Sequence, residues 1–152
     1  MAAIVPTGIS ASLREGKMSR IKQVSVSISG AVNGEPMLKE YMGEYEYRDN
    51  THNIAYTDYT GNVITKCALQ ASDTEMLLHR TGGFSGDLWF DTQTDRIVKY
   101  AAFSADKGFM LHTDEYRLTA EQGKVCIFVR YVMYDGSEQD TICGKLSIEI
   151  SD

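Results

Sequence analysis

Residues 21–47 read IKQVSVSISGAVNGEPMLKEYMGEYEY, and this stretch decides the fold. Over residues 24–29, valine and isoleucine alternate with serine, the period of two that is typical of a half-buried strand. Asn33-Gly34 then favours a two-residue hairpin turn, because a type I′ turn needs positive φ at both central residues. Residues 37–47 place tyrosines on one face and glutamates on the other. The stretch therefore predicts an antiparallel hairpin.

The same alternation continues to the end of the chain, giving about ten strand segments at the spacing of 8–12 residues found in β-barrels and sandwiches. The further runs lie at residues 54–59, 63–69, 76–80, 87–90, 97–103, 109–118, 125–133 and 142–150. No helical pattern separates them, which excludes parallel βαβ units. Short connections join antiparallel neighbours and favour an up-and-down meander. We predict an all-β fold, a single antiparallel meander that closes into a barrel and so has no edge strands.

The 152 residues suit one domain of ordinary size. Residues 1–20 are rich in Ala, Ser and Gly and have weak periodicity. We expect them to form an N-terminal tail or a plug over one end of the fold, and residues 21–152 to form the barrel. The abundance of aromatic residues, with only 2 prolines in the chain, agrees with a β fold.

Composition and charge exclude several kinds of partner. The formal charge is −6 and no Lys/Arg cluster stands out, so nucleic acid and anionic membranes are poor candidates. The N-terminus has no signal-peptide pattern, and no run approaches the ~18 apolar residues of a membrane helix. Cys67, Cys126 and Cys143 form no C-x-x-C pair and indicate free thiols. We expect a soluble cytoplasmic protein without a cofactor, either a monomer or a homodimer.

Arg80 is the most informative single residue. It has the same strand parity as Met76 and Leu78, so a regular strand points all three side chains to one face. If that face is the barrel interior, the guanidinium is a buried or half-buried cation and needs an acceptor. Asp58, which shares parity with Tyr56, is a candidate acceptor.

Two interpretations of Arg80 remain open. It binds a ligand carboxylate or phosphate through bidentate hydrogen bonds, or it is structural, packed on Trp89 or capping backbone carbonyls. A bulge that turned Leu77 and His79 inward would remove the argument for a site. The predicted ligand-binding residues are Arg80, Asp58, Tyr56, Trp89, Tyr100 and Tyr131. No catalytic residue is predicted.

The tyrosines also permit two interpretations. Tyr41, Tyr45 and Tyr47 share a strand face, and further tyrosines recur along the chain. In a barrel pocket, phenols supply apolar walls and hydrogen-bonding tips that suit an amphipathic ligand. The same residues also fill cores and cross-strand positions in any sheet.

No local motif indicates a metal site. His52, His79 and His112 are scattered, and no zinc-protease or calcium-loop spacing occurs, so no metal is predicted. His52 lies beside a turn, which suggests a solvated side chain. The glycine-rich residues 82–86 are interpreted as a hairpin, because the spacing and context of a nucleophile elbow are missing.

Several short motifs together resemble the YwiB-like family of small bacterial proteins of unknown function. They are Ile54–Asp58, Gly61–Thr65, Arg80–Gly82, Leu88–Phe90, Tyr100, Thr113 and Leu118. The resemblance covers roughly residues 21–150, and it departs at residues 101–108, where the family often has a compact turn with proline. It implies a calycin-type fold, similar to lipocalins and fatty-acid-binding proteins, and carries no established activity.

These observations lead to three functional hypotheses. The first is a non-enzymatic binding protein, a calycin-like barrel that holds an apolar or amphipathic small molecule with Arg80 as a polar anchor. The second is an enzyme that uses inward Tyr, Arg and acidic residues for acid–base chemistry, an analogy from fold alone. The third is a structural or homodimerisation module that pairs through an incompletely closed barrel edge.

Overall fold

The computed structural model describes residues 21–100, 109–134 and 141–152, and strands make up most of these residues. The strands are β1 (Lys22–Val32), β2 (Glu35–Arg48), β3 (Thr51–Asp58), β4 (Thr65–Ala71), β5 (Glu75–Gly82), β6 (Gly86–Asp91), β7 (Arg96–Tyr100), β8 (Phe109–Glu121), β9 (Lys124–Tyr134) and β10 (Ile142–Ser151). The expected tail or plug at residues 1–20 lies outside the described residues, as does the turn expected after β7. Within the described part, no helix is long and apolar enough to cross a membrane.

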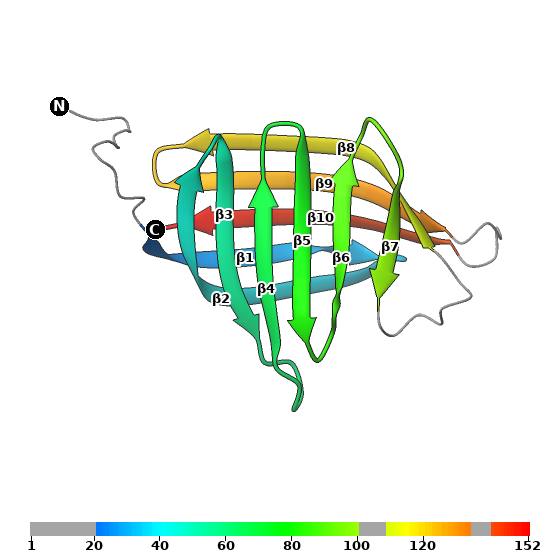
Figure 1. The fold of residues 1–152 in the computed structure, drawn as a ribbon, viewed down its shortest axis with the longest axis horizontal. Helices are drawn as coiled ribbons and strands as arrows, with labels where there is room; N and C mark the ends of the chain where they lie inside the picture. Colours follow the sequence, from blue (N-terminus) through cyan, green and yellow to red (C-terminus); the bar gives the residue numbers. More distant parts are fainter. Residues whose placement is uncertain (1–20, 101–108, 135–140) are drawn as a thin grey trace.

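The strands form a closed antiparallel barrel in which each strand pairs with its neighbour in sequence and β1 pairs with β10 (Figure 1). The predicted all-β meander is therefore confirmed. The β1–β2 ladder runs from Lys22 to Val32, whereas β7 and β8 are joined only from Arg96 to Val98. Strand β7 has the shortest ladders of the barrel, with two residue pairs to β6 and three to β8.

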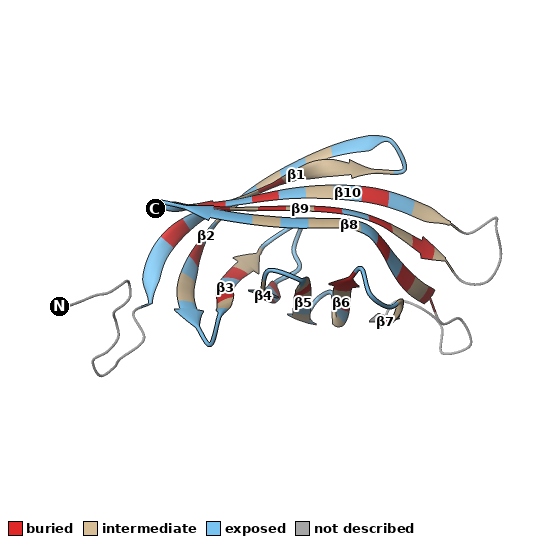
Figure 2. Ribbon diagram, turned by 90° about the horizontal axis from the view of Figure 1, so that it is seen from above, coloured by how far each residue is buried: buried red, intermediate tan, exposed pale blue. Residues whose placement is uncertain are grey.

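The barrel is flattened into two layers. Strands β3–β7 form one layer, and β1, β8, β9 and β10 run across it in the other, steeply crossed to the first (Figures 1 and 2). Such orthogonal packing brings the inner faces of both layers onto one core. The alternation of buried and exposed residues along each strand follows from this arrangement (Figure 2).

The inner faces pack into a continuous apolar core. Its largest fully buried side chains are Phe90, Leu69, Met76, Leu111, Ile127, Val26 and Val129. They come from both layers, so the middle of the barrel is filled by side chains. Any ligand site must therefore lie toward an end of the barrel or on its outer surface.

The turns follow the local chemistry of the sequence. Asn33 and Gly34 have φ of 50° and 82°, as a type I′ hairpin turn requires. Asp49 and Asn50 have φ of 55° and 61° and turn the chain from β2 into β3 in the same way. Because this second turn ends at Asn50, β3 begins at Thr51 and His52 is the second residue of the strand.

Candidate functional site

Arg80 lies in a row of residues that crosses three neighbouring strands. Tyr56 on β3 pairs with Cys67 on β4, and Cys67 pairs with Arg80 on β5. Tyr56 and Cys67 are buried and Arg80 is half-buried. The β4–β5 register is regular, and Met76 and Leu78 of β5 are buried. The predicted inward face of Arg80 is therefore confirmed, and no bulge turns His79 inward.

Tyr41 and Asp58 complete this cluster, which we call the Arg80 end: Tyr41, Tyr56, Asp58, Cys67 and Arg80. The Tyr41 ring stacks on Tyr56 with centroids 4.6 Å apart. The Tyr41 hydroxyl donates to Oδ2 of Asp58 at 3.1 Å. Oδ1 of Asp58 accepts from the backbone N–H of Thr60 at 2.9 Å and also from the Thr60 hydroxyl. Oδ2 of Asp58 is thus hydrogen-bonded to Tyr41 and Oδ1 to Thr60. The pairing of Asp58 with Arg80 stays a prediction.

Burial and charge keep the inner groups of the Arg80 end in one protonation state. Burial raises the pKa of Tyr41 to about 12, and the Asp58 carboxylate adds to the rise. Burial likewise raises the pKa of Tyr56 and of the Cys67 thiol, while the positive charge of Arg80 acts in the opposite direction on all three. At neutral pH these groups therefore stay protonated and can donate hydrogen bonds.

Asp58 has the opposite character. Burial opposes its ionisation, but hydrogen bonds from Thr60 and Tyr41 together outweigh burial and hold its pKa below the usual value. Lys39 adds to this lowering. Asp58 is therefore ionised at neutral pH, and its charge is shared among the donors that surround it.

Two uncharged hairpin tips border the Arg80 end. Neither residues 59–65 nor residues 81–86 include a charged side chain. Their exposed apolar side chains are Tyr59, Val63, Ile64 and Phe84, which we call the apolar rim. The tips are tied together because the N–H of Gly83 donates to the Ile64 carbonyl at 2.9 Å and that of Phe84 to Oγ1 of Thr65 at 3.2 Å. A Cβ at Gly83 would overlap Cγ1 of Val63, so a larger residue here would force the Val63 side chain to move.

Trp89 does not belong to the Arg80 end. It alternates with the buried Leu88 and Phe90 and lies on the outer face. Its Nε1 donates to Glu75 at 2.7 Å, and the guanidinium over its ring, 3.8 Å from the centroid, belongs to Arg96. The alternative that Arg80 packs on Trp89 is therefore wrong.

The remaining two predicted ligand-binding residues, Tyr131 and Tyr100, are not part of the Arg80 end as defined above. Tyr131 is 5% exposed and meets the edge of Phe90 in the core, with centroids 5.3 Å apart. It packs against Gly144, where a side chain would collide with its ring. The backbone of Tyr100 pairs with Gly86, and its side chain lies outside the described residues.

His52 departs from its expected solvated state, because its side chain is only 8% exposed. Strand β3 begins at Thr51, so His52 shares the inner face with Ile54 and Tyr56. Nδ1 of His52 and the Tyr45 hydroxyl are hydrogen-bonded at 2.7 Å. Burial lowers the pKa of His52, partly offset by Asp73, so the imidazole is neutral at neutral pH. The sequence did contain an indication of this burial, because His52 has the same strand parity as Ile54. The turn at residues 49–50 led instead to the prediction of a solvated side chain.

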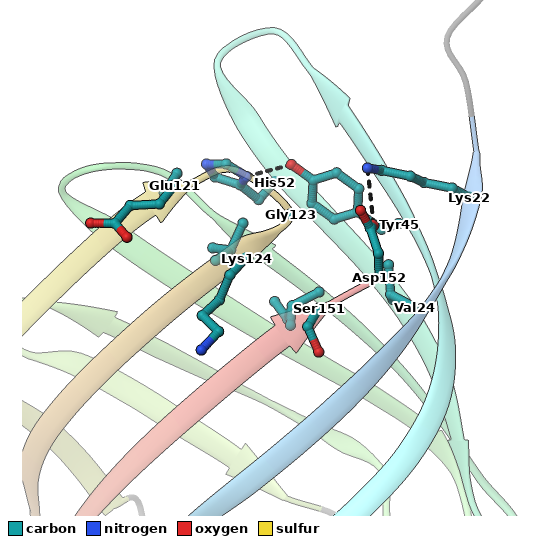
Figure 3. A pocket seen from close by; sticks show the side chains of 12 residues that line it. Lys22, Val24, Tyr45, His52, Glu121, Gly123, Lys124, Ser151 and Asp152 are labelled. Atoms are coloured by element: carbon teal, nitrogen blue, oxygen red, sulfur yellow. Dashed lines mark hydrogen bonds and ion pairs between the residues drawn. The ribbon is translucent and has the colours of Figure 1, made fainter.

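His52 and Tyr45 form one wall of a cavity of about 120 Å³ (Figure 3). Its floor is apolar and consists of Val24, Val125 and Ile150, all of which are buried. Its charged lining residues are Lys22, Glu121, Lys124 and Asp152. We call this cavity the His52 end. Asp58 lies six positions after His52 along β3, so the two ends are roughly 20 Å apart.

Among the residues that the structure describes, no three His, Cys, Asp or Glu side chains are grouped so as to hold a metal ion. Neither end is therefore interpreted as a metal centre.

Comparison with known proteins agrees with the fold. Residues 21–150 match the model of a domain of unknown function (DUF1934). The chain belongs to this family. Its structure is similar to the crystal structure of ywiB protein from Bacillus subtilis, with a TM-score of 0.72 and 17% sequence identity over 88% of this chain and 94% of that chain. The comparison with curated proteins finds no match. At 17% identity, the similarity supports the barrel fold of this DUF1934 chain. It carries no information on activity, which must be inferred from the residues of this chain.

Proposed function

We propose that this DUF1934 barrel binds a small amphipathic anion at the Arg80 end. The observation that carries the proposal is the row of Tyr56, Cys67 and Arg80, in which a half-buried arginine shares the inner face with two buried residues, next to the Tyr41–Asp58 pair. A guanidinium binds carboxylate or phosphate through two parallel hydrogen bonds. The apolar part of the ligand would contact the apolar rim, because exposed apolar groups gain from being covered.

The charge of Asp58 would weaken anion binding if it faced the ligand directly. Its two oxygens, however, accept hydrogen bonds from Tyr41 and Thr60, which spread its charge. We assign Asp58 a positioning role: it orients the Tyr41 ring, and the stack orients Tyr56. Arg80 then provides the charge that faces the ligand.

The protonation states favour binding over acid–base catalysis. A general acid or base works best when its pKa lies near the operating pH. The pKa values of Tyr41 and Tyr56 are raised and that of Asp58 is lowered, so each group is held away from neutral pH.

The free cysteines support the accompanying proposal that the protein works in the cytoplasm. Cys67, Cys126 and Cys143 are free thiols, and such thiols are typical of reducing compartments. Cys67 is buried in the Arg80 end itself, where oxidation to a larger group would disturb the row.

Titration with decanoate, decyl phosphate and decanol tests the proposal, with binding measured by calorimetry on the wild-type chain and on Arg80→Met. We expect both anions to bind more tightly than decanol, and Arg80→Met to weaken the anions at least about tenfold, the value of a charged hydrogen-bond pair. Arg130→Met, which replaces an exposed arginine, is the matched control and should leave all three affinities unchanged. Equal binding of decanol and decanoate, or an unchanged Arg80→Met, would overturn the proposal.

A further inference from the structure

Exposed apolar side chains are concentrated on the two hairpin tips beside the Arg80 end. Among the residues that the structure describes, nine large apolar side chains are exposed, and four of these form the apolar rim. Tyr59, Ile64 and Phe84 are 68%, 57% and 51% exposed. Apolar side chains scattered singly over a surface are ordinary, whereas a group of them on adjoining segments indicates a contact surface. The apolar rim is therefore a candidate docking surface.

The two tips are tied together and project from one end of the barrel. The β3–β4 and β5–β6 connections lie at the same end of the β3–β7 layer, and the β3–β4 connection extends beyond the ends of the strands (Figure 1). The N–H of Gly83 donates to the Ile64 carbonyl at 2.9 Å, and the Val63 side chain fills the space beside Gly83. The exposed apolar side chains thus lie on one projecting edge of the molecule.

Cations lie at the base of the uncharged tips. Nζ of Lys39 donates to the Thr60 hydroxyl at 3.0 Å, which places this ammonium at the base of the β3–β4 tip. Lys66 directly follows that tip, and Arg80 directly precedes the β5–β6 tip. Because β4 and β5 are paired, these two residues belong to neighbouring strands. Three cations therefore border the apolar rim.

The carboxylates beside the tips are bonded within the fold. Asp58 precedes the β3–β4 tip and accepts hydrogen bonds from the N–H and the hydroxyl of Thr60. Asp87 follows the β5–β6 tip and is hydrogen-bonded to Nδ1 of His79. The three cations at the tips thus exceed the two carboxylates, in a chain whose formal charge is −6. An apolar edge with an excess of cations behind it complements a surface that has phosphate groups outside and apolar groups inside.

We propose that the apolar rim docks on the surface of a zwitterionic lipid bilayer. The rim side chains enter the boundary between headgroups and acyl chains, where Tyr59 keeps its hydroxyl in the polar layer. Lys39, Lys66 and Arg80 then lie at the level of the headgroup phosphates. The net charge of −6 opposes an anionic surface, so the lipid to which we assign the rim is zwitterionic. Docking goes beyond the anion site and does not depend on it.

The size of the tips favours a lipid surface over a protein partner. A stable protein–protein interface takes about 20–30 residues from each side, and the tips are the short segments 59–65 and 81–86. Four residues of these segments are glycines, which add no side-chain surface. A bilayer needs no complementary shape, because a few apolar side chains can enter it individually.

The first arm of the test is co-sedimentation of the full chain with phosphatidylcholine vesicles. We expect binding that persists in roughly 0.5 M sodium chloride, because burial of apolar groups drives it. Phe84→Ser and Ile64→Ser should each weaken binding about tenfold, since each removes a large apolar side chain from the contact. Leu38→Ser and Met42→Ser, at positions 66% and 68% exposed on β2, are the matched controls and should have no effect.

The second arm locates the contact on the molecule. The isotope-labelled chain is mixed with phosphatidylcholine bicelles that contain a nitroxide lipid, which broadens the signals of amides close to the bilayer. We expect broadening at residues 59–65 and 81–86, and none at Ser72 in the β4–β5 turn at the opposite end of the same layer (Figure 1). Thermal denaturation of each variant checks that the fold is retained.

The outcomes separate docking from the anion site. Arg80→Met should change vesicle binding by less than about threefold, because the apolar rim provides most of the contact. Failure of the wild type to bind vesicles, or full binding by Phe84→Ser and Ile64→Ser, would overturn docking, whereas the preference for decanoate over decanol tests the anion site alone. Broadening away from the two tips would also overturn it. A dimer that Phe84→Ser abolishes in sedimentation velocity would assign the rim to a second copy instead.

Discussion

The Arg80 end and the His52 end of the barrel are built in different ways. The Arg80 end consists of a row across adjacent strands, β3 to β5, bordered by hairpin tips of the same layer. The His52 end joins the start of β1, the β8–β9 turn and the end of β10 to β2 and β3. The first is fixed by short-range pairing and the second by closure of the barrel. A change in local pairing should therefore affect the Arg80 end, and a change in closure the His52 end.

The largest expected difference between the ends is in stability. Tyr56 is 7% exposed and stacked on Tyr41, so Tyr56→Ala leaves a cavity and should lower the free energy of unfolding by about 3–5 kcal/mol. Tyr45 is only partly buried at its cavity wall, so Tyr45→Ala should cost roughly 1–2 kcal/mol. Urea denaturation measures both, and similar slopes of the two transitions are the control for two-state unfolding. Equal losses would contradict the deeper burial of Tyr56.

Loss of anion binding is the next expected effect. Arg80→Met should weaken decanoate at least about tenfold, whereas Lys22→Gln at the His52 end should leave decanoate binding unchanged. The reason is the separation of roughly 20 Å along β3, at which exposed charges are screened at ordinary salt. Calorimetry on both variants measures the two affinities. Loss of decanoate binding in Lys22→Gln, with the fold intact, would show that the two ends are coupled.

The sequence predicted the Arg80 end better than the His52 end for a physical reason. Strand alternation and turn chemistry are local, so the ten strands, the Asn33-Gly34 turn and the inward face of Arg80 could be predicted. Which residues stand beside Arg80 depends on register, which pairing decides. Trp89 was misgrouped because Leu88, Trp89 and Phe90 are all apolar, and such a run does not reveal which member faces inward.

The cavity at the His52 end could not be predicted from local pattern. Its rim charges Lys22, Lys124 and Asp152 are far apart in sequence and become neighbours only because β1, β9 and β10 are adjacent in the closed barrel. Taken singly, each of these residues is an ordinary exposed charge at the end of a strand. His52 was the one accessible signal, since its parity with Ile54 predicts burial.

The pH dependence of stability should distinguish the buried His52 from the exposed His112. Burial lowers the pKa of His52 below 6.5, so the folded state binds fewer protons than the unfolded chain. This contribution is complete above the unfolded pKa and is lost as pH falls toward the folded value. His112 has Nδ1 2.8 Å from Asp95 and Nε2 3.1 Å from Asp114, and the hydrogen bond to Asp95 raises its pKa above 6.5. Its stabilisation is complete below the unfolded pKa and is lost as pH rises through the folded value.

The measurement is the free energy of unfolding of His52→Gln and His112→Gln between about pH 5 and pH 8. The loss of stability in His52→Gln should shrink as pH falls, and the loss in His112→Gln should grow. Tyr45 and Tyr47 face His52, with Asp73 adding a distant charge, while Asp95 and Asp114 face His112. Parallel pH profiles for the two variants would contradict the burial of His52.

The smallest effect concerns the Lys22–Asp152 ion pair at the His52 end. Both side chains are more than half exposed, so Lys22→Gln should change the free energy of unfolding by less than about 1 kcal/mol. Urea denaturation of the variant and of the wild type measures this difference. A loss of more than about 2 kcal/mol would contradict the expectation, because an exposed ion pair that is screened by solvent does not contribute that much.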